Sequence, residues 1–306
     1  MGAQGLQVGI STPWDVGSLT PDQLRERLIA IADAGIDHLF TADHVSFHDG
    51  SGIDGLVRLA ALSGLEPRLG LYLGVYLLAL RHPMVAARQI ATLAEMVPGR
   101  LTVGVGVGGE DRHEFKVCGV DPATRGRRTD ASLMIVRALL AGETVRGDGE
   151  FFDFRDGRIL PTPKPAVAFA VGGRSNAALE RAGRFGDGWL AAWCSPRRFR
   201  EGTEIVETIG ADRSVSWQHG LQIWLGVGAN AEDGRVHVAR RMTQFYKLDF
   251  EAFAKYTPTG TARQIADDLR PFVEAGATHL NLTACGADRH AEIEAVAEIR
   301  RLLKEP

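Results

Sequence analysis

The sequence contains few cysteines, and none of them stands at a spacing typical of a metal site. Its three cysteines are Cys118, Cys194 and Cys285, so their number is odd and no CxxC pair occurs. Disulfide frameworks and zinc sites need cysteines in even number or at short, fixed spacing. The histidines also lack the paired spacing of a metal-dependent hydrolase. We therefore expect reduced thiols, no disulfide framework and no metal.

Positive charge is not in excess, since 35 Lys and Arg residues stand against 38 Asp and Glu residues, a net charge of -3. A nucleic-acid-binding protein usually carries a clear surplus of Lys and Arg. Long apolar runs are missing too: no segment reaches the about 18 uninterrupted apolar residues that a membrane-spanning helix needs, and the N-terminus does not resemble a signal peptide. These absences predict a cytoplasmic protein with neither nucleic acid nor membrane as a partner.

What is present is the composition of a globular enzyme, with 45% hydrophobic and 24% charged residues. A chain of 306 residues is long enough for two ordinary domains or for one (β/α)8 barrel, which typically takes about 250 residues. The sequence has neither a marked domain boundary nor a repeat of fixed period. We therefore predict a single domain over residues 1–306.

Residues 168–190 have the pattern of a strand, a glycine turn, a helix and the start of another strand. The first four residues, AFAV, are an apolar run typical of a buried parallel strand, and Gly172 and Gly173 permit a turn that comes close to a ligand. Ser175 or Asn176 can cap the helix that follows, and the N-terminus of a helix attracts anions. This corner could hold a phosphate, or it could be an ordinary tight turn.

The same alternation of strand and helix continues along the whole chain. The expected strands cover residues 6–10, 38–42, 69–75, 101–107, 168–171, 188–192, 279–283 and part of 220–227. The expected helices include 21–34, 81–96, 128–140, 261–276 and 289–303, and helical stretches are expected within 231–256. No GxGxxG sequence occurs in the first unit, which argues against a doubly wound sheet. The alternation predicts an α/β fold, a (β/α)8 TIM barrel. Residues 142–165, rich in Gly, Asp, Phe and Pro, are expected to form an insertion outside it.

In a (β/α)8 barrel the active site lies at the carboxyl ends of the strands, so the polar residues just after each strand are the candidates. They are Asp43, His44, Glu110, Trp193, Cys194, Ser195 and residues 172–176. Asp43 and His44 form the most reactive pair, because a carboxylate beside an imidazole can orient a ligand and tune a proton donor near neutral pH. The alternative is that Asp43 caps a turn and His44 is an ordinary polar residue of the loop.

Three segments carry a resemblance to a known family. They are LGVYLLALRHPMVAARQIATLAEMVPGRLTVGVGVGG at 73–109, GVDPATRGRR at 119–128 and GGRSNAALERAGRFGDGWL at 172–190. The sequence resembles the bacterial luciferase-like oxidoreductases, and within them the enzymes that use the deazaflavin coenzyme F420. The resemblance covers nearly the whole chain and implies a TIM barrel that assembles as a homodimer.

The resemblance implies a role for several residues in binding the cofactor or moving protons. A non-prolyl cis peptide is expected at Gly74–Val75, where it would support the central ring of the cofactor. Asp43 would contact the deazaflavin, and His44 would donate a proton or orient the substrate. The residues expected to lie along the cofactor or to hold its phosphate are Gly106, Val107, Gly108, Gly172, Gly173, Arg174, Ser175 and Asn176.

Two features differ from the deazaflavin-dependent sugar-phosphate dehydrogenases of this family. Those enzymes place a carboxylate base directly after the GxG of strand four, but here Gly109 has that position and Glu110 comes one residue later. We therefore assign no catalytic role to Glu110. The Lys and Arg positions that bind the substrate phosphate have no convincing counterparts either. The run of arginines at 125–128 could reach the acidic tail of F420 or form a solvated helix start.

These features predict an F420-dependent oxidoreductase that transfers a hydride between the deazaflavin and a small organic molecule. One alternative is an FMN-dependent monooxygenase that uses reduced flavin and oxygen. Another is a protein that binds the cofactor without turnover. The compact chain argues against the first alternative, and the Asp43–His44 pair argues against the second, because pure binding needs no proton donor.

Overall fold

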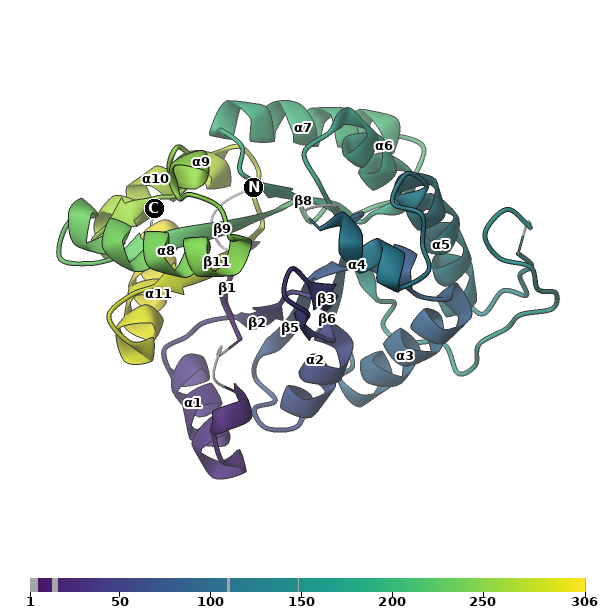
Figure 1. The fold of residues 1–306 in the computed structure, drawn as a ribbon, viewed down its shortest axis with the longest axis horizontal. Helices are drawn as coiled ribbons and strands as arrows, with labels where there is room; N and C mark the ends of the chain where they lie inside the picture. The colour runs from purple at the N-terminus through teal and green to yellow at the C-terminus, as the bar shows by residue number, and fades with distance from the viewer. Residues whose placement is uncertain (1–4, 13–15, 109–110, 148, 306) are drawn as a thin grey trace. The chain divides into compact units, whose positions relative to one another are not determined.

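The structure is a computed structural model that describes residues 5–12, 16–108, 111–147 and 149–305. Its main strands are β1 (Gln7–Ser11), β2 (His38–Thr41), β5 (Gly70–Tyr76), β6 (Leu101–Val105), β7 (Ala168–Gly172), β8 (Gly188–Ala192), β9 (Gly220–Val227), β10 (Thr259–Gly260) and β11 (His279–Cys285) (Figure 1). They are hydrogen-bonded in the order β10-β9-β11-β1-β2-β5-β6-β7-β8, and β9 also pairs with β8. This is the strand order of a (β/α)8 barrel, so the predicted fold class is confirmed.

Helices follow the strands in sequence. They are α1 (Pro21–Asp33), α2 (Gly55–Ser63), α3 (Pro83–Met96), α5 (Arg125–Leu140), α6 (Asn176–Phe185), α7 (Pro196–Ile209), α8 (Ala231–Tyr246), α10 (Ala262–Glu274) and α11 (Arg289–Lys304), with short additions at η2 (Val16–Ser18), η3 (Leu78–Leu80), α4 (Arg112–Val117) and α9 (Glu251–Ala254). Helix α1 begins where the sequence predicts it, because Thr20 and Gln23 form a capping box around Pro21. Ser195 caps α7 ahead of Pro196, because its side chain accepts a hydrogen bond from Arg198 N.

One compact unit contains Met1–Phe40 and Gly188–Pro306. In it β1 pairs in parallel with β2 and β11, and β9 pairs in parallel with β11 and β8. Strand side chains such as Val8, Leu221 and Leu280 are fully buried, as are Leu28 and Ile31 on the inner face of α1. Burying one side chain of this kind stabilises a fold by about 1.5–3 kcal/mol, so the apolar strand runs drive this unit together.

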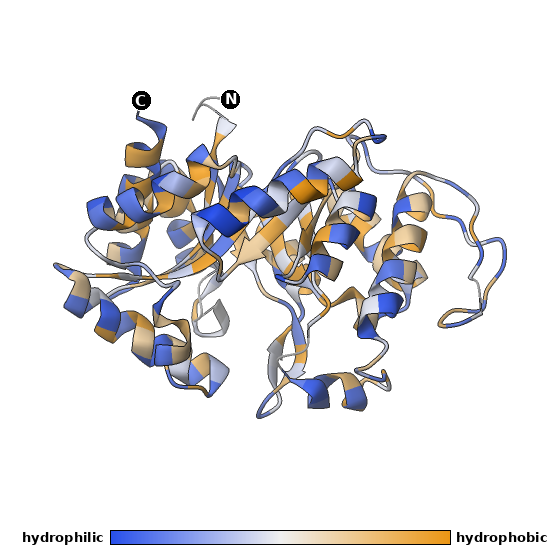
Figure 2. Cartoon of the chain, turned by 90° about the horizontal axis from the view of Figure 1, so that it is seen from above, coloured by the Kyte–Doolittle hydropathy of each residue, from blue (hydrophilic) through white to orange (hydrophobic). Residues whose placement is uncertain are grey.

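The second compact unit is Thr41–Asp187. Here β6 pairs in parallel with β5 and with β7. Val103 and Phe169 are buried in the strands, while Leu133 of α5 and Leu179 of α6 are buried in the helices. In both units, hydrophobic residues gather on the strands and hydrophilic residues on the outward faces of the helices (Figure 2).

The chain after β2 differs from the loop that the sequence predicts. His44 begins β3 (His44–Phe47), which pairs in an antiparallel manner with β4 (Ser51–Ile53), and α2 follows directly. Both strands are short and contain Ser, Gly or His, so they lack the apolar alternation by which a strand is recognised in a sequence. The helical stretches predicted within 231–256 are confirmed as two helices, α8 and α9, and Lys247, which adopts a left-handed conformation (φ 54°), ends α8.

The predicted insertion at 142–165 is confirmed. Among its described residues there is no helix or named strand, only an isolated antiparallel bridge between Val145 and Gly157. Backbone hydrogen bonds from Gly147 to Phe154 and from Gly149 to Phe152 continue this pairing as a hairpin. The insertion packs on the barrel helices through Phe152, whose ring faces the guanidinium of Arg128 at 4.6 Å.

Two histidines of the first unit lie on its strands, and His38 is buried whereas His279 is partly buried. His38 Nε2 lies 2.7 Å from Asn281 Oδ1, and a Cβ on Gly9 would meet the His38 ring at 2.2 Å, so only glycine leaves room for it. Burial lowers the pKa of His38, although the hydrogen bond with Asn281 opposes the shift. Burial also lowers the pKa of His279 to about 3. Both rings are therefore neutral in the folded protein at neutral pH.

These histidines predict a loss of stability in mild acid. The unfolded chain takes up protons on both rings below a pH of about 6.5, whereas the folded chain does not. Because the unfolded state then binds more protons, this contribution is fully present above that pH and is lost as the pH falls. The free energy of unfolding should be measured by urea denaturation at a series of pH values. In His279→Gln, its decrease with falling pH should be smaller than in the wild type by about 1.4 kcal/mol per pH unit.

The matched control is His290→Gln on α11, where the histidine side chain is 81% exposed. This variant should keep the pH dependence of the wild type. If the stability of His279→Gln has the same pH dependence as that of the wild type, the neutral ring of His279 does not cause the loss of stability in acid.

Candidate active site

Every residue predicted to bind the cofactor or to move protons lies within the Thr41–Asp187 unit. These residues follow β2, β5, β6 and β7 at their carboxyl ends, where a (β/α)8 barrel builds its active site. Gly109 and Glu110 lie outside the described residues. The site can therefore be built from one unit.

The end of β5 contains the irregularity that the resemblance predicts. The Gly74–Val75 peptide is cis, so this prediction is confirmed. The pairing of β5 with β6 shifts register between Leu73 and Tyr76, which makes a bulge at the same place. That the bulge contacts a cofactor stays a prediction.

Glycines of β6 and of the loop behind it make room for this bulge. A Cβ on Gly104 would lie 2.4 Å from the carbonyl oxygen of Leu73, and a Cβ on Gly106 would lie 2.3 Å from Cγ2 of Val75. Such distances are far inside van der Waals contact, so a side chain at either position would displace the bulge. Gly108 has a φ of 60°, which favours glycine for a different reason.

Asp43 lies directly after β2, and its buried carboxylate is fully engaged. Oδ1 accepts hydrogen bonds from Gly55 N at 3.0 Å and from Arg81 at 2.8 Å. Oδ2 accepts from Leu77 N at 3.0 Å and from Arg81 at 2.6 Å. The Asp43 side chain thus joins the start of α2 to the chain after β5, with none of its surface exposed.

Burial raises the pKa of the Asp43 carboxyl, and the charge of Arg81 and the N–H groups of Leu77 and Gly55 oppose that shift. Burial would also lower the pKa of Arg81, but the charge of Asp43 outweighs it and holds Arg81 protonated. All four contacts of the carboxylate are donors, so we assign Asp43 the ionised form at neutral pH. These contacts fit a residue that positions the strand ends, and the predicted contact between Asp43 and a deazaflavin stays a prediction.

His44 lies at the start of the β3–β4 hairpin and is held on two sides. Its Nδ1 is 3.1 Å from Oε2 of Glu114, and its ring stacks on Phe47 with centroids 4.1 Å apart. The side chain is 19% exposed, so it stays accessible to a small molecule. His44 is therefore an imidazole with a fixed orientation and a carboxylate partner, an arrangement typical of a group that accepts and donates protons.

The sequence analysis missed Glu114, which is buried on α4. Asp111 and Glu114 have the spacing of an N-cap followed by an acidic residue at the third helical position, and Asp111 does cap the helix through His113 N. That pattern by itself suggests that Glu114 turns back to its own helix. It binds the β3 hairpin instead, because its Oε1 accepts from Val45 N at 2.6 Å and from Ser46 N at 3.2 Å.

The glycine corner after β7 has the predicted local structure. Ser175, rather than Asn176, caps α6, and its Oγ accepts from Ala178 N at 3.2 Å. Gly173 has a φ of 133°, and a Cβ there would lie 2.7 Å from Cβ of Ala178. Residues 174–176 are exposed at the N-terminus of the helix, so the corner is open to an anion.

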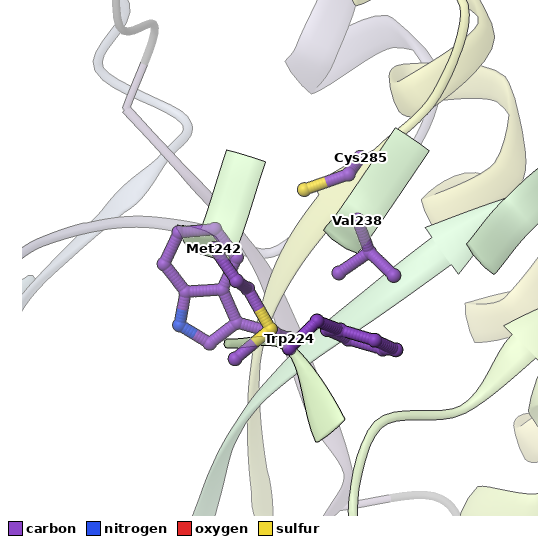
Figure 3. Close-up of a cluster of buried hydrophobic side chains, with 5 residues drawn as sticks. Trp224, Val238, Met242 and Cys285 are labelled. Carbon is purple, nitrogen blue, oxygen red and sulfur yellow. The ribbon is translucent and has the colours of Figure 1, made fainter. Parts of the chain in front are cut away.

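The tryptophans at the ends of β8 and β9 differ in burial. Trp224 of β9 is only 7% exposed and belongs to a buried cluster with Val238, Met242 and Cys285 (Figure 3). Trp193 follows β8, is partly buried and packs against Phe253 with ring centroids 5.3 Å apart. Trp224 is therefore a core residue.

The thiols and acidic residues that the structure describes form no metal site. All three cysteines are free. Within the described ranges, no group of three or more His, Cys, Asp or Glu side chains is placed to hold a metal ion. In the same part of the chain, no helix is both long and apolar enough to cross a membrane.

The chain resembles known proteins over most of its length. It is 30% identical over 316 aligned positions to the F420-dependent glucose-6-phosphate dehydrogenase of Beutenbergia cavernae, covering 91% of this chain and 92% of that protein. It is also 36% identical over 145 residues to an uncharacterized protein of Mycobacterium tuberculosis, and here the chain spans only about half the length of the relative, 50%.

Two solved structures share the fold. An F420-dependent secondary alcohol dehydrogenase, solved with an F420-acetone adduct, superposes with a TM-score of 0.82 at 20% identity over 100% of both chains. The oxygenating constituent of 3,6-diketocamphane monooxygenase of Pseudomonas putida, solved with FMN, superposes with a TM-score of 0.74 at 15% identity over 98% of both chains.

The model of one family, the luciferase-like monooxygenases, matches residues 6–255. This match covers most of the chain, including β5, β6, β7 and the residues of the candidate site. The chain therefore belongs to the luciferase-like monooxygenase family.

Proposed function

We propose that this protein is an oxidoreductase that binds coenzyme F420 and transfers a hydride between the deazaflavin and a small organic molecule. The observation that carries the proposal is the bulge at Gly74–Val75. Gly104 and Gly106 leave room for this bulge, because neither has a side chain that would collide with it. The family resemblance implies that the central ring of the cofactor would lie against this bulge. A relative with a full-length match, from Beutenbergia cavernae, carries the name of an F420-dependent dehydrogenase.

The residues of the site suit such a cofactor. Its phosphate would lie at the corner after β7, where Ser175 begins α6 and the helix dipole attracts an anion. Arg174, which is exposed there, would add a positive charge. The bound deazaflavin would supply the carbon that takes up or gives the hydride.

The protein's own contribution to the reaction is position and a proton. His44 is the group that would take a proton from the substrate or return it, because its side chain is accessible and its ring is fixed. Asp43 would act through the backbone, by holding the chain after β5 against the start of α2. The homodimer and the cytoplasmic location expected from the sequence belong to the same proposal.

An FMN-dependent monooxygenase is the second candidate. It is favoured by the description of the family and by the likeness to an FMN-containing monooxygenase structure. A protein that binds either cofactor without turnover is the third, and it would fit if His44→Ala changed neither binding nor the rate of any reaction. The cofactor that binds is therefore the first property to measure.

Titration of the purified protein with F420 and with FMN, followed by tryptophan fluorescence, should give micromolar binding of F420. Arg174→Ala should weaken F420 binding about tenfold, because a hydrogen bond to a charged group contributes about 1.5–3 kcal/mol. Arg184→Ala, at the other end of α6, is the matched control and should bind F420 like the wild type. Micromolar binding of FMN alone would contradict the F420 proposal and favour the FMN-dependent monooxygenase.

A second prediction concerns the part of the site where the central ring of the cofactor would lie, at the bulge of β5. Gly106→Ala should weaken F420 binding at least about tenfold, because the new Cβ would collide with Val75 and displace the bulge, and overpacking of this kind costs about 1–3 kcal/mol. Gly64→Ala is the control, since Gly64 is exposed at the end of α2 and a Cβ there would have no neighbour within 4 Å. Wild-type F420 affinity in Gly106→Ala would show that the ring does not lie against the bulge.

A further inference from the structure

We propose that Glu114 is a positioning residue that fixes the proton of neutral His44 on Nδ1 and so leaves Nε2 as the nitrogen that exchanges protons. The catalytic importance of this tautomer rests on the proposed function, whereas the contacts between Glu114 and His44 do not depend on it. The sequence patterns assign no role to Glu114 in the site.

The two oxygens of Glu114 have separate partners. Oε1 accepts from the backbone N–H groups of Val45 and Ser46, at 2.6 and 3.2 Å. Oε2 lies 3.1 Å from Nδ1 of His44. A carboxylate can only accept hydrogen bonds, so the hydrogen between Oε2 and Nδ1 must be carried by the ring nitrogen.

The charge state of Glu114 supports this assignment. Burial raises the pKa of the carboxyl, but the hydrogen bond and charge of His44 and the N–H groups of Val45 and Ser46 outweigh it, so the pKa lies below its ordinary value. Glu114 is therefore a carboxylate at neutral pH. Among the neighbouring groups, its charge raises the pKa of the Cys118 thiol, which burial has already raised, and Arg81 opposes that shift.

The ring of His44 has little freedom to turn away from Glu114. Phe47, only 3% exposed, stacks on it at an interplanar angle of 30°. The backbone of His44 pairs with Ile53 across the hairpin. A buried carboxylate, a buried aromatic ring and a strand pairing thus fix one face and one nitrogen of the imidazole.

This arrangement determines which nitrogen does chemistry. With the Nδ1 proton held by Glu114, the lone pair of the neutral ring is on Nε2, which can take a proton from a substrate hydroxyl while the O–H electrons stay on the oxygen. The imidazolium that forms keeps its Nδ1–H bond to Glu114 and returns the proton from Nε2 in the reverse direction.

A single isosteric substitution reverses the pattern. In Glu114→Gln the amide oxygen keeps the position of Oε1, because Val45 and Ser46 both offer N–H donors there. The amide NH2 group then faces Nδ1 of His44 and donates to it. Nδ1 becomes the acceptor, so the proton of the neutral ring must move to Nε2.

The tautomer of His44 can be measured directly by long-range 1H–15N NMR on protein labelled at the histidine nitrogens, at about pH 8, where an ordinary histidine is neutral. The His44 resonances are assigned by their loss in His44→Gln. We expect the Nδ1–H form in the wild type and the Nε2–H form in Glu114→Gln.

The matched control is Asp111→Asn. Asp111 ties the same helix to the same hairpin, because it accepts from His48 N at 2.8 Å and from His113 N at 2.8 Å, and no hydrogen bond joins it to His44 among the contacts of the described residues. This variant loses a comparable backbone contact but should keep the Nδ1–H tautomer. A role of Glu114 limited to holding the hairpin would give the same tautomer in all three proteins.

The Nε2–H tautomer in the wild type, or an unchanged tautomer in Glu114→Gln, would overturn the proposal. If Glu114→Gln does not fold by circular dichroism, the wild-type tautomer decides alone. The outcome is separate from that of the proposed function: the expected tautomers together with no F420 binding would remove the cofactor assignment and leave the role of Glu114 intact.

Discussion

The buried pair of Asp43 and Arg81 is the interaction on which the rest of the site depends. The Asp43 carboxylate accepts hydrogen bonds from two guanidinium nitrogens of Arg81 and from the backbone N–H groups of Gly55 and Leu77. Removal of one partner from a buried ion pair costs about 3–5 kcal/mol, because the other charge is left without compensation. This pair therefore fixes the chain after β2 to the chain after β5. The hairpin that carries His44 starts at the next residue.

The site is then completed by residues that have little freedom. Glu114 joins α4 to the hairpin and orients His44, while Gly106 leaves the space that Val75 of the bulge occupies. Nothing in this arrangement needs a metal ion or an unusual nucleophile. In the proposed function, this site would contribute position and one proton, and the bound cofactor would supply the redox step.

Local patterns in the sequence predicted much of this structure. The eight apolar strands, the cis peptide at Gly74–Val75 and the Ser175 cap after the double glycine depend on neighbouring residues or on a family resemblance, and all three are present. Glu114 could not be found this way, because 70 residues separate it from His44 and its capping-like spacing suggests a contact within its own helix. The β3–β4 hairpin was missed for a related reason, since strands of four and three residues carry too short a pattern.

The central claim is that one unit holds a deazaflavin between the bulge of β5 and the N-terminus of α6. A crystal structure of the protein with F420 bound tests this most directly. We expect the central ring against Gly74 and Val75, with the side chain of His44 at the ring and the phosphate at residues 173–176. A phosphate bound away from α6, or a ring that does not touch the bulge, would contradict it.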